Sequence, residues 1–132
     1  MYGWLLGKNK NKILLIKISI ENTKIKTAKG TIDKINATYY TNEFKIIEIV
    51  DEYCNKYYFA DINKIIDEKY CKKVKLELNE TYTDFGIFFY INTERALDDI
   101  YLFDNKYTGI AKQYLLNGEL VEQITLNKGL QK

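Results

Sequence analysis

A β-hairpin is encoded most clearly near the end of the chain, where Asn117-Gly118 separates two runs with strand character, 110–116 and 119–126. A tight two-residue hairpin turn needs positive φ at both central residues, and Asn and Gly tolerate positive φ best. We therefore predict a C-terminal β-hairpin with an Asn117-Gly118 turn.

The composition favours strands in the rest of the chain as well. The 132 residues include twelve Tyr and six Phe, and aromatic side chains pack well on the half-buried surface of a sheet. Proline is absent, so Gly, Asn and Asp must form the turns. A chain of this length can bury its own core without disulfides or metal. We predict a single domain, 1–132, with a β-rich α+β fold that is mostly an antiparallel β-meander.

Apolar runs bounded by polar residues predict the individual strands. The clearest is Ile13–Ile20, with the sequence ILLIKISI, and Glu21-Asn22-Thr23 and Lys29-Gly30 supply the reversals that follow it. The other predicted strands are 24–28, 31–40, 74–78, 86–91 and 98–103, with a loop over 79–84.

Helical spacing of apolar residues occurs in two further segments. In 43–58 it competes with a group of β-branched residues, which lower helix propensity. We predict strands over 43–50 and 57–60, with a helix as the alternative. In 61–72, Asp61 can cap a helix and Ile62, Ile65 and Ile66 follow at helical spacing. This pattern predicts the main helix, near residues 61–72.

Charge is distributed unevenly along the chain, although the net charge is only +2. Residues 1–40 contain eight lysines and two acids, whereas 41–132 carry a net charge of −4. The segment 76–104 holds seven acids and one basic residue, Arg95. Such asymmetry can mark an interaction surface. The competing interpretation is a set of solvated strand faces and turns.

Residues suited to catalysis or metal binding are scarce. The chain has no histidine, which is the commonest general base and transition-metal ligand. Asp98 and Asp99 would point to opposite faces of a strand, so they would not form a carboxylate pair. Cys54 and Cys71 lack metal-ligand spacing; we predict free, buried thiols, with a single disulfide as the alternative. We predict a protein that is not an enzyme and needs no cofactor or metal.

The lysine-rich N-terminal third raises the alternative of nucleic-acid binding. Together with Trp4, Tyr39 and Tyr40, six lysines could form a basic, aromatic surface. These lysines are Lys8, Lys10, Lys12, Lys24, Lys26 and Lys29. Arginine, which suits bidentate phosphate contacts, occurs only once, so a solvated lysine surface without a nucleic-acid partner is favoured.

The N-terminus bears on localisation. Its longest apolar run is Ile13 to Ile16, far shorter than a signal-peptide core or a membrane span. We therefore predict a cytoplasmic protein without a membrane partner.

The C-terminal half contains an internal repeat. The segment 82–100 aligns with 107–124, so that Tyr90 corresponds to Tyr114 and Asn92 to Asn117. Both copies predict the same unit of strand, turn and strand.

The tail, Tyr101–Gly129, resembles the MORN-variant repeat of bacteria. In that repeat a glycine opens a strand, an aromatic residue precedes an Asn-Gly turn, and a second glycine closes the unit. The matching residues are Tyr107-Thr108-Gly109-Ile110, Tyr114, Asn117-Gly118-Glu119-Leu120 and Asn127-Lys128-Gly129. In the earlier copy Thr93 stands where the repeat has its turn glycine.

The resemblance implies an immunity or antitoxin protein, because such repeats are known from antitoxins encoded beside polymorphic toxins and from membrane-associated scaffolds. The protein would neutralise one cognate toxin by stoichiometric binding and occlusion. The alternatives are a structural or scaffold interaction module and a phage-type inhibitor of a host defence enzyme.

The acidic segment supplies the predicted contact surface. Toxins that act on nucleic acid tend to present basic clefts, so we expect a basic toxin, such as a nuclease, as the partner. The predicted partner-binding residues are Glu94, Asp98, Asp99, Tyr101 and Asp104, with Tyr101 as the aromatic anchor.

Overall fold

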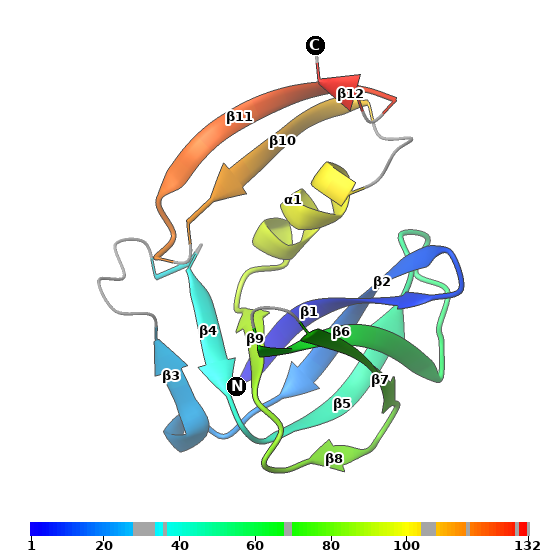
Figure 1. Ribbon diagram of the computed structural model, residues 1–132, viewed down its shortest axis with the longest axis vertical. Helices are drawn as coiled ribbons and strands as arrows, with labels where there is room; N and C mark the ends of the chain where they lie inside the picture. Colours follow the sequence, from blue (N-terminus) through cyan, green and yellow to red (C-terminus); the bar gives the residue numbers. More distant parts are fainter. Residues whose placement is uncertain are drawn as a thin grey trace.

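The computed structural model describes residues 1–27, 34–35, 37–67, 70–103, 108–115, 117–128 and 130–131, with the backbone alone for 64–67, 70–71, 99–103 and 130–131. The described chain is mostly antiparallel β-structure with one α-helix, α1 (Thr93–Phe103). This helix lies between a large curled sheet and a small C-terminal sheet (Figure 1).

Nine strands form the large sheet within the described residues. They are β1 (Tyr2–Asn9), β2 (Lys12–Ser19), β3 (Ile25–Thr27), β4 (Thr38–Thr41), β5 (Phe44–Val50), β6 (Phe59–Asp67), β7 (Tyr70–Glu77), β8 (Thr81–Tyr82) and β9 (Ile87–Tyr90). Hydrogen-bonded neighbours follow the order β3-β4-β9-β1-β2-β5-β8, and β6 pairs with both β1 and β7. A short 3-10 helix, η1 (Asn22–Lys24), precedes β3.

Strand β1 is where the sheet curls back on itself. One edge of β1 pairs with β2 along its whole length. On its other edge, Trp4 pairs with Tyr90 of β9, and Lys8 pairs with Asp61 of β6. Gly3 and Gly7 permit this crowding, since a Cβ on Gly3 would lie 2.4 Å from the Phe89 ring.

The core lies inside the curl. Alternate residues of β2 point inward, so that Leu14, Ile16 and Ile18 are fully buried. The other fully buried apolar side chains of this core are Phe44, Ile46, Ile49, Leu76 and Phe89, together with Ala37 and Ala60. The main core therefore combines residues of β2, β5, β6, β7 and β9 with single residues of β1 and β4, and it leaves out the C-terminal sheet.

Several predicted strands are confirmed. The predictions for 13–20, 43–50, 74–78 and 86–91 correspond to β2, β5, β7 and β9. The strand predicted over 24–28 begins one residue later, as β3, and residue 28 lies outside the described residues. In the segment 31–40 a strand is described from Thr38; residues 34–35 form a turn, and 31–33 and 36 lie outside the described residues. Strand β1 was not predicted, and the loop predicted over 79–84 contains β8.

The helix predicted near 61–72 is wrong, because this segment belongs to the β6–β7 hairpin. The two strands pair from Phe59↔Glu77 to Asp67↔Tyr70. Ala60 and Ile62 are buried on one face of β6, and the strand hydrogen-bonds to β1. The isoleucines of this segment lie at helical spacing, but their β-branched side chains also fit a strand. Pairing with the edge of β1 favours the strand.

The strand predicted over 98–103 is also wrong, because these residues lie in α1. Asn92 starts the helix: its side-chain oxygen accepts a hydrogen bond from the Glu94 amide at 3.1 Å, which is typical of an N-cap. The earlier repeat copy is therefore strand followed by helix, and its predicted strand–turn–strand form is corrected.

The predicted C-terminal hairpin is confirmed, with a longer turn than expected. Strands β10 (Gly109–Tyr114) and β11 (Leu120–Asn127) pair, and β12 (Leu130–Gln131) extends the sheet. The Gly118 amide donates to the Leu115 carbonyl oxygen at 3.0 Å, and Leu115 pairs with Glu119. Gly118 has a φ of 92°, which lies in the left-handed region. It is the last residue of this turn, whereas the predicted two-residue turn placed it at a central position.

Candidate protein-binding site

The loop from Asp51 to Tyr58, which joins β5 to β6 and is called the tyrosine loop below, is organised around one carboxylate. The Asp51 side chain is only 2% exposed. Its Oδ1 accepts hydrogen bonds from the amides of Tyr53 and Asn55, both at 2.9 Å. Its Oδ2 accepts from Asn55 Nδ2 at 3.1 Å, and from Lys12 Nζ and the Tyr57 hydroxyl, each at 3.3 Å.

These contacts set the ionisation of Asp51. Burial acts to raise its pKa, but the hydrogen bonds from the Asn55 amide, the Asn55 side chain, the Tyr53 amide and Lys12 outweigh burial and lower the pKa from 3.8 to about 2. The bond to Asp51 in turn raises the pKa of Lys12. The loop is thus built on a carboxylate that stays ionised at neutral pH.

The backbone of the tyrosine loop is equally constrained. Asp51 and Asn55 are joined by a 3.1 Å backbone hydrogen bond, and the Tyr57 amide donates to Ile49 at 2.9 Å. Cys54 adopts a φ of 64° at the tip. Its thiol is free and exposed, which corrects the expectation of a buried thiol; the side chain of Cys71 lies outside what the structure describes.

Two tyrosines of this ordered loop face solvent. Tyr53 is 73% exposed and Tyr58 is 81% exposed, the two highest values among the large hydrophobic side chains that the structure describes. A well-ordered loop that holds large rings in water favours a binding surface over a purely structural role.

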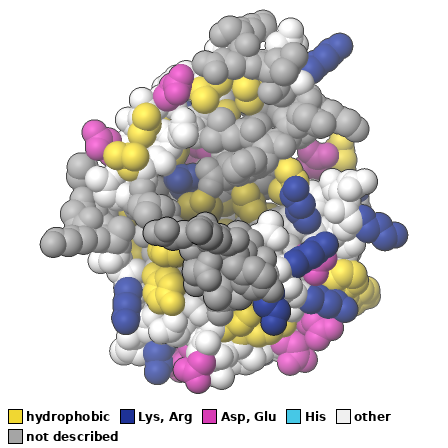
Figure 2. Space-filling model, viewed as in Figure 1, with side chains coloured by type: hydrophobic (Ala, Val, Ile, Leu, Met, Phe, Trp, Pro, Cys, Tyr) yellow, Lys and Arg dark blue, Asp and Glu magenta, His cyan; other side chains and the backbone are white. Residues whose placement is uncertain are grey.

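Lysines surround the tyrosine loop. Lys12 Nζ lies 6.0 Å from the centre of the Tyr53 ring, and Lys75 Nζ lies 4.3 Å from that of Phe59. Register places Lys8, Asp61 and Lys75 side by side on three strands. Basic side chains gather on the right of the space-filling view, which corresponds to the β1–β2 turn and the tyrosine loop (Figure 2).

The N-terminal lysines do not form the single surface considered from the sequence. Lys8, Lys10 and Lys12 lie at the β1–β2 turn, whereas Lys24 and Lys26 lie in η1 and β3 at a distant part of the sheet. Lys29 is outside the described residues. Trp4 and Tyr2 instead contact Lys17, whose Nζ lies 4.5 Å from the centre of the Tyr2 ring.

The predicted partner-binding residues belong to α1 and the segment after it. Glu94 is exposed in the first turn. Asp98 is half-buried, and its Oδ1 accepts a hydrogen bond from the Lys112 amide of β10 at 3.3 Å. The structure places Asp99 and Tyr101 on the helix by their backbone alone, and Asp104 lies outside the described residues. Glu94 is therefore the one member shown with a solvent-facing side chain.

Arg95, the sole arginine, has a structural position. It is only 4% exposed, and its guanidinium carbon lies 4.6 Å from the centre of the Tyr90 ring and 4.7 Å from that of Tyr114. These rings come from β9 and β10, so Arg95 joins the large sheet, α1 and the C-terminal sheet. The aromatic positions aligned in the repeat, Tyr90 and Tyr114, thus meet in space on one cation.

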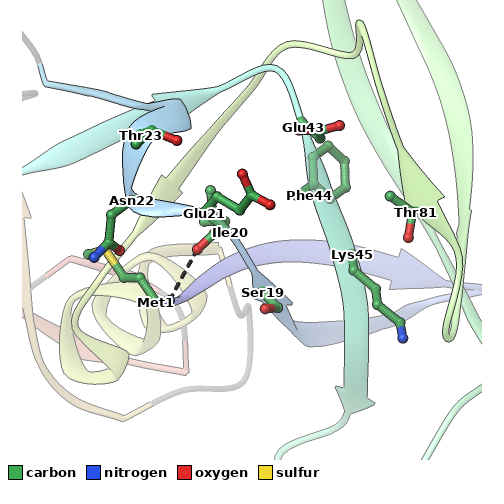
Figure 3. Close-up of a pocket in the computed structure, with 10 residues that line it drawn as sticks. All are labelled: Met1, Ser19, Ile20, Glu21, Asn22, Thr23, Glu43, Phe44, Lys45 and Thr81. Carbon is green, nitrogen blue, oxygen red and sulfur yellow. Dashed lines mark hydrogen bonds between the residues drawn. The ribbon is translucent and has the colours of Figure 1, made fainter.

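An open pocket of about 690 Å³ lies elsewhere, between the end of β2 with η1 on one side and the start of β5 with β8 on the other (Figure 3). Glu21, Glu43 and Lys45 contribute charge, and Phe44 contributes its buried ring. Glu43 also lies 3.9 Å from Lys24 Nζ. The lining combines both signs of charge with an apolar floor, so it selects no single class of ligand.

Few features of the sequence predicted the tyrosine loop. The available signal was an Asp after a β-branched run, followed by Asn55 in a segment without Gly or Pro, which is typical of a side-chain-stabilised turn.

Among the described residues, no group of three or more acidic or cysteine side chains could hold a metal ion, and no helix is long and apolar enough to cross a membrane. Comparisons of the chain with protein-family models, with curated proteins and with solved structures found no match.

Proposed function

We propose that this protein is an immunity or antitoxin protein that neutralises a cognate bacterial toxin by direct, stoichiometric binding and occlusion. The observation that carries the proposal is the tyrosine loop, in which a buried carboxylate holds the backbone while Tyr53 and Tyr58 remain in solvent. The MORN-variant resemblance of the tail supplies the class of partner.

The physical support lies in preorganisation. Ordering a loop on binding consumes part of the interaction free energy, and a loop that is already ordered avoids this cost. Tyrosine is among the residues that dominate binding energy at protein interfaces, because it buries a large ring and keeps a polar hydroxyl. A rigid loop with two such rings is suited to tight occlusion of one partner.

The test uses the domain encoded by the adjacent gene as the candidate toxin, purified with and without this protein. We expect a 1:1 complex by size-exclusion chromatography with light scattering, together with loss of toxin activity. Tyr53→Ala and Tyr58→Ala should each weaken binding by about 30-fold or more.

Phe88→Ala provides the matched control. Phe88 is 61% exposed on β9, where it pairs with Tyr40 away from the tyrosine loop. Its removal should leave the affinity unchanged. The absence of any complex with the wild-type protein would overturn the proposed function.

A further inference from the structure

The surface around the tyrosine loop contains many exposed lysines, so it carries positive charge beside the exposed rings. Seven lysines with described side chains are exposed on the β1–β2 turn, the loop and the β6–β7 hairpin: Lys8, Lys10, Lys12, Lys56, Lys72, Lys73 and Lys75. The same elements contribute four acids with described side chains: Asp51, Glu52, Asp61 and Glu77.

Most of these acids are already engaged within the surface. Asp51 binds Lys12, Asp61 lies 3.5 Å from Lys73 Nζ, and Glu77 lies 3.6 Å from Lys75 Nζ. Lys8, Lys10, Lys56 and Lys72 form no ion pair with a described residue. Among the acids of these elements with described side chains, Glu52 alone is left to oppose them, so the described part of the surface carries an excess of positive charge next to the exposed rings.

We propose that the tyrosine loop and the lysines flanking it bind an acidic patch of the partner protein, with partner carboxylates at Lys10 and Lys56 and apolar partner side chains on Tyr53 and Tyr58. The inference rests on the proposed function and specifies its binding surface. It differs from the expectation that a basic partner binds the acidic residues of α1.

The pairing of rings with ammonium groups explains the choice of partner chemistry. Lys12 lies over Tyr53 and Lys75 over Phe59, so a cation stands beside an apolar surface in both places. A protein segment that mixes Asp or Glu with apolar residues satisfies both features at once. Complementary charge accelerates encounter and excludes like-charged partners.

A protein fits this surface better than a nucleic acid does. Arginine, the residue best suited to phosphate, is present only as Arg95, which is buried between two rings. Acids are interspersed with the lysines in the same rows of the sheet, as Asp61 is between Lys8 and Lys75. A continuous track of phosphates would be repelled there.

The experiment measures the affinity for the adjacent toxin domain by calorimetry at about 50 and about 300 mM NaCl. We expect the double variant Lys10→Glu/Lys56→Glu to bind at least about tenfold more weakly, and wild-type affinity to fall at the higher salt concentration. The control, Lys26→Glu/Lys45→Glu, changes two exposed lysines elsewhere on the sheet and should bind like the wild type.

Each alternative has its own result. A complex that depends on Tyr53 and Tyr58 but not on Lys10, Lys56 or salt would overturn the inference and leave the proposed function standing. Tighter binding by the double variant, with weaker binding by Glu94→Lys, would show a basic partner and also overturn it. Lysine-dependent binding of a mixed-sequence single-stranded RNA of about 16 nucleotides would replace it with nucleic-acid recognition. No complex at all would overturn both.

Discussion

At the scale of single residues, Asp51 shows how one buried charge can order a surface loop. An ionised carboxylate without partners would be costly to bury, but here the acceptor is matched by two backbone amides, two polar side chains and a lysine. An Asn side chain keeps one acceptor oxygen but replaces the other with an NH2 donor, so it could not accept from all of these donors.

We expect Asp51→Asn to lower the free energy of unfolding at pH 7. Because the folded-state pKa of Asp51 is lowered from 3.8 to about 2, its stabilising effect is present above pH 3.8 and is lost as the pH falls through about 2. The difference between wild type and variant should therefore narrow from pH 4 to pH 2. Urea denaturation at several pH values measures it, and a difference independent of pH would contradict the role assigned to the carboxylate.

Arg95 is a charged residue whose burial could not be predicted from the sequence. It stood alone in an acidic segment, and nothing in the pattern indicated that a charged side chain would be 4% exposed between Tyr90 and Tyr114. The repeat alignment placed those two tyrosines at corresponding positions but predicted no contact between them. Their common contact required knowledge of tertiary structure, which sequence spacing does not contain.

At the scale of elements, strands with alternating burial could be predicted and the location of the helix could not. In β2 the alternate residues 14, 16 and 18 are buried, and the apolar run bounded by polar residues was sufficient to predict this strand. In 61–72 and 98–103 the local pattern admitted both forms. Pairing with β1 selected the strand in the first case, and the Asn92 cap selected the helix in the second.

The cap of α1 can be tested directly. We expect Asn92→Ala to lower the free energy of unfolding by about 1 kcal/mol, because the Glu94 amide loses its acceptor at the helix start. Asn92→Asp should restore most of the loss, since Asp is an equally good N-cap. Chemical denaturation of the three proteins checks this, and equal stability of the alanine variant would show that the cap contributes nothing.

The candidate site was the least predictable element. Its tyrosines are exposed, so they leave no periodic signal, and its order depends on the hydrogen bonds of Asp51 within the loop and to Lys12 on another hairpin. The acidic residues predicted to bind a partner are close together in the sequence. In the structure, however, Asp98 accepts a hydrogen bond from the Lys112 amide at the edge of β10, so it contributes to packing within the protein.

At the scale of the whole molecule, two sheets of unequal burial are held together by one helix. Strand β2 has three fully buried apolar side chains, whereas Ala111 and Leu126 are the buried side chains among those described on β10 and β11. Helix α1 packs on β10 as well as on β1 and β9, and Arg95 stacks between rings from both sheets. The C-terminal sheet is therefore attached to the main core without belonging to it.

This arrangement predicts that the C-terminal sheet opens before the large sheet unfolds. Native-state hydrogen exchange should show lower protection for the amides of β10 and β11 than for those of β2, because local stability follows buried contacts.

Arg95→Lys keeps the charge but loses the planar stacking on Tyr90 and Tyr114, which should cost about 0.5–2 kcal/mol. The variant should therefore exchange faster in β10 and β11 and not in β2. Equal acceleration in both sheets would mean that the molecule unfolds as one cooperative unit.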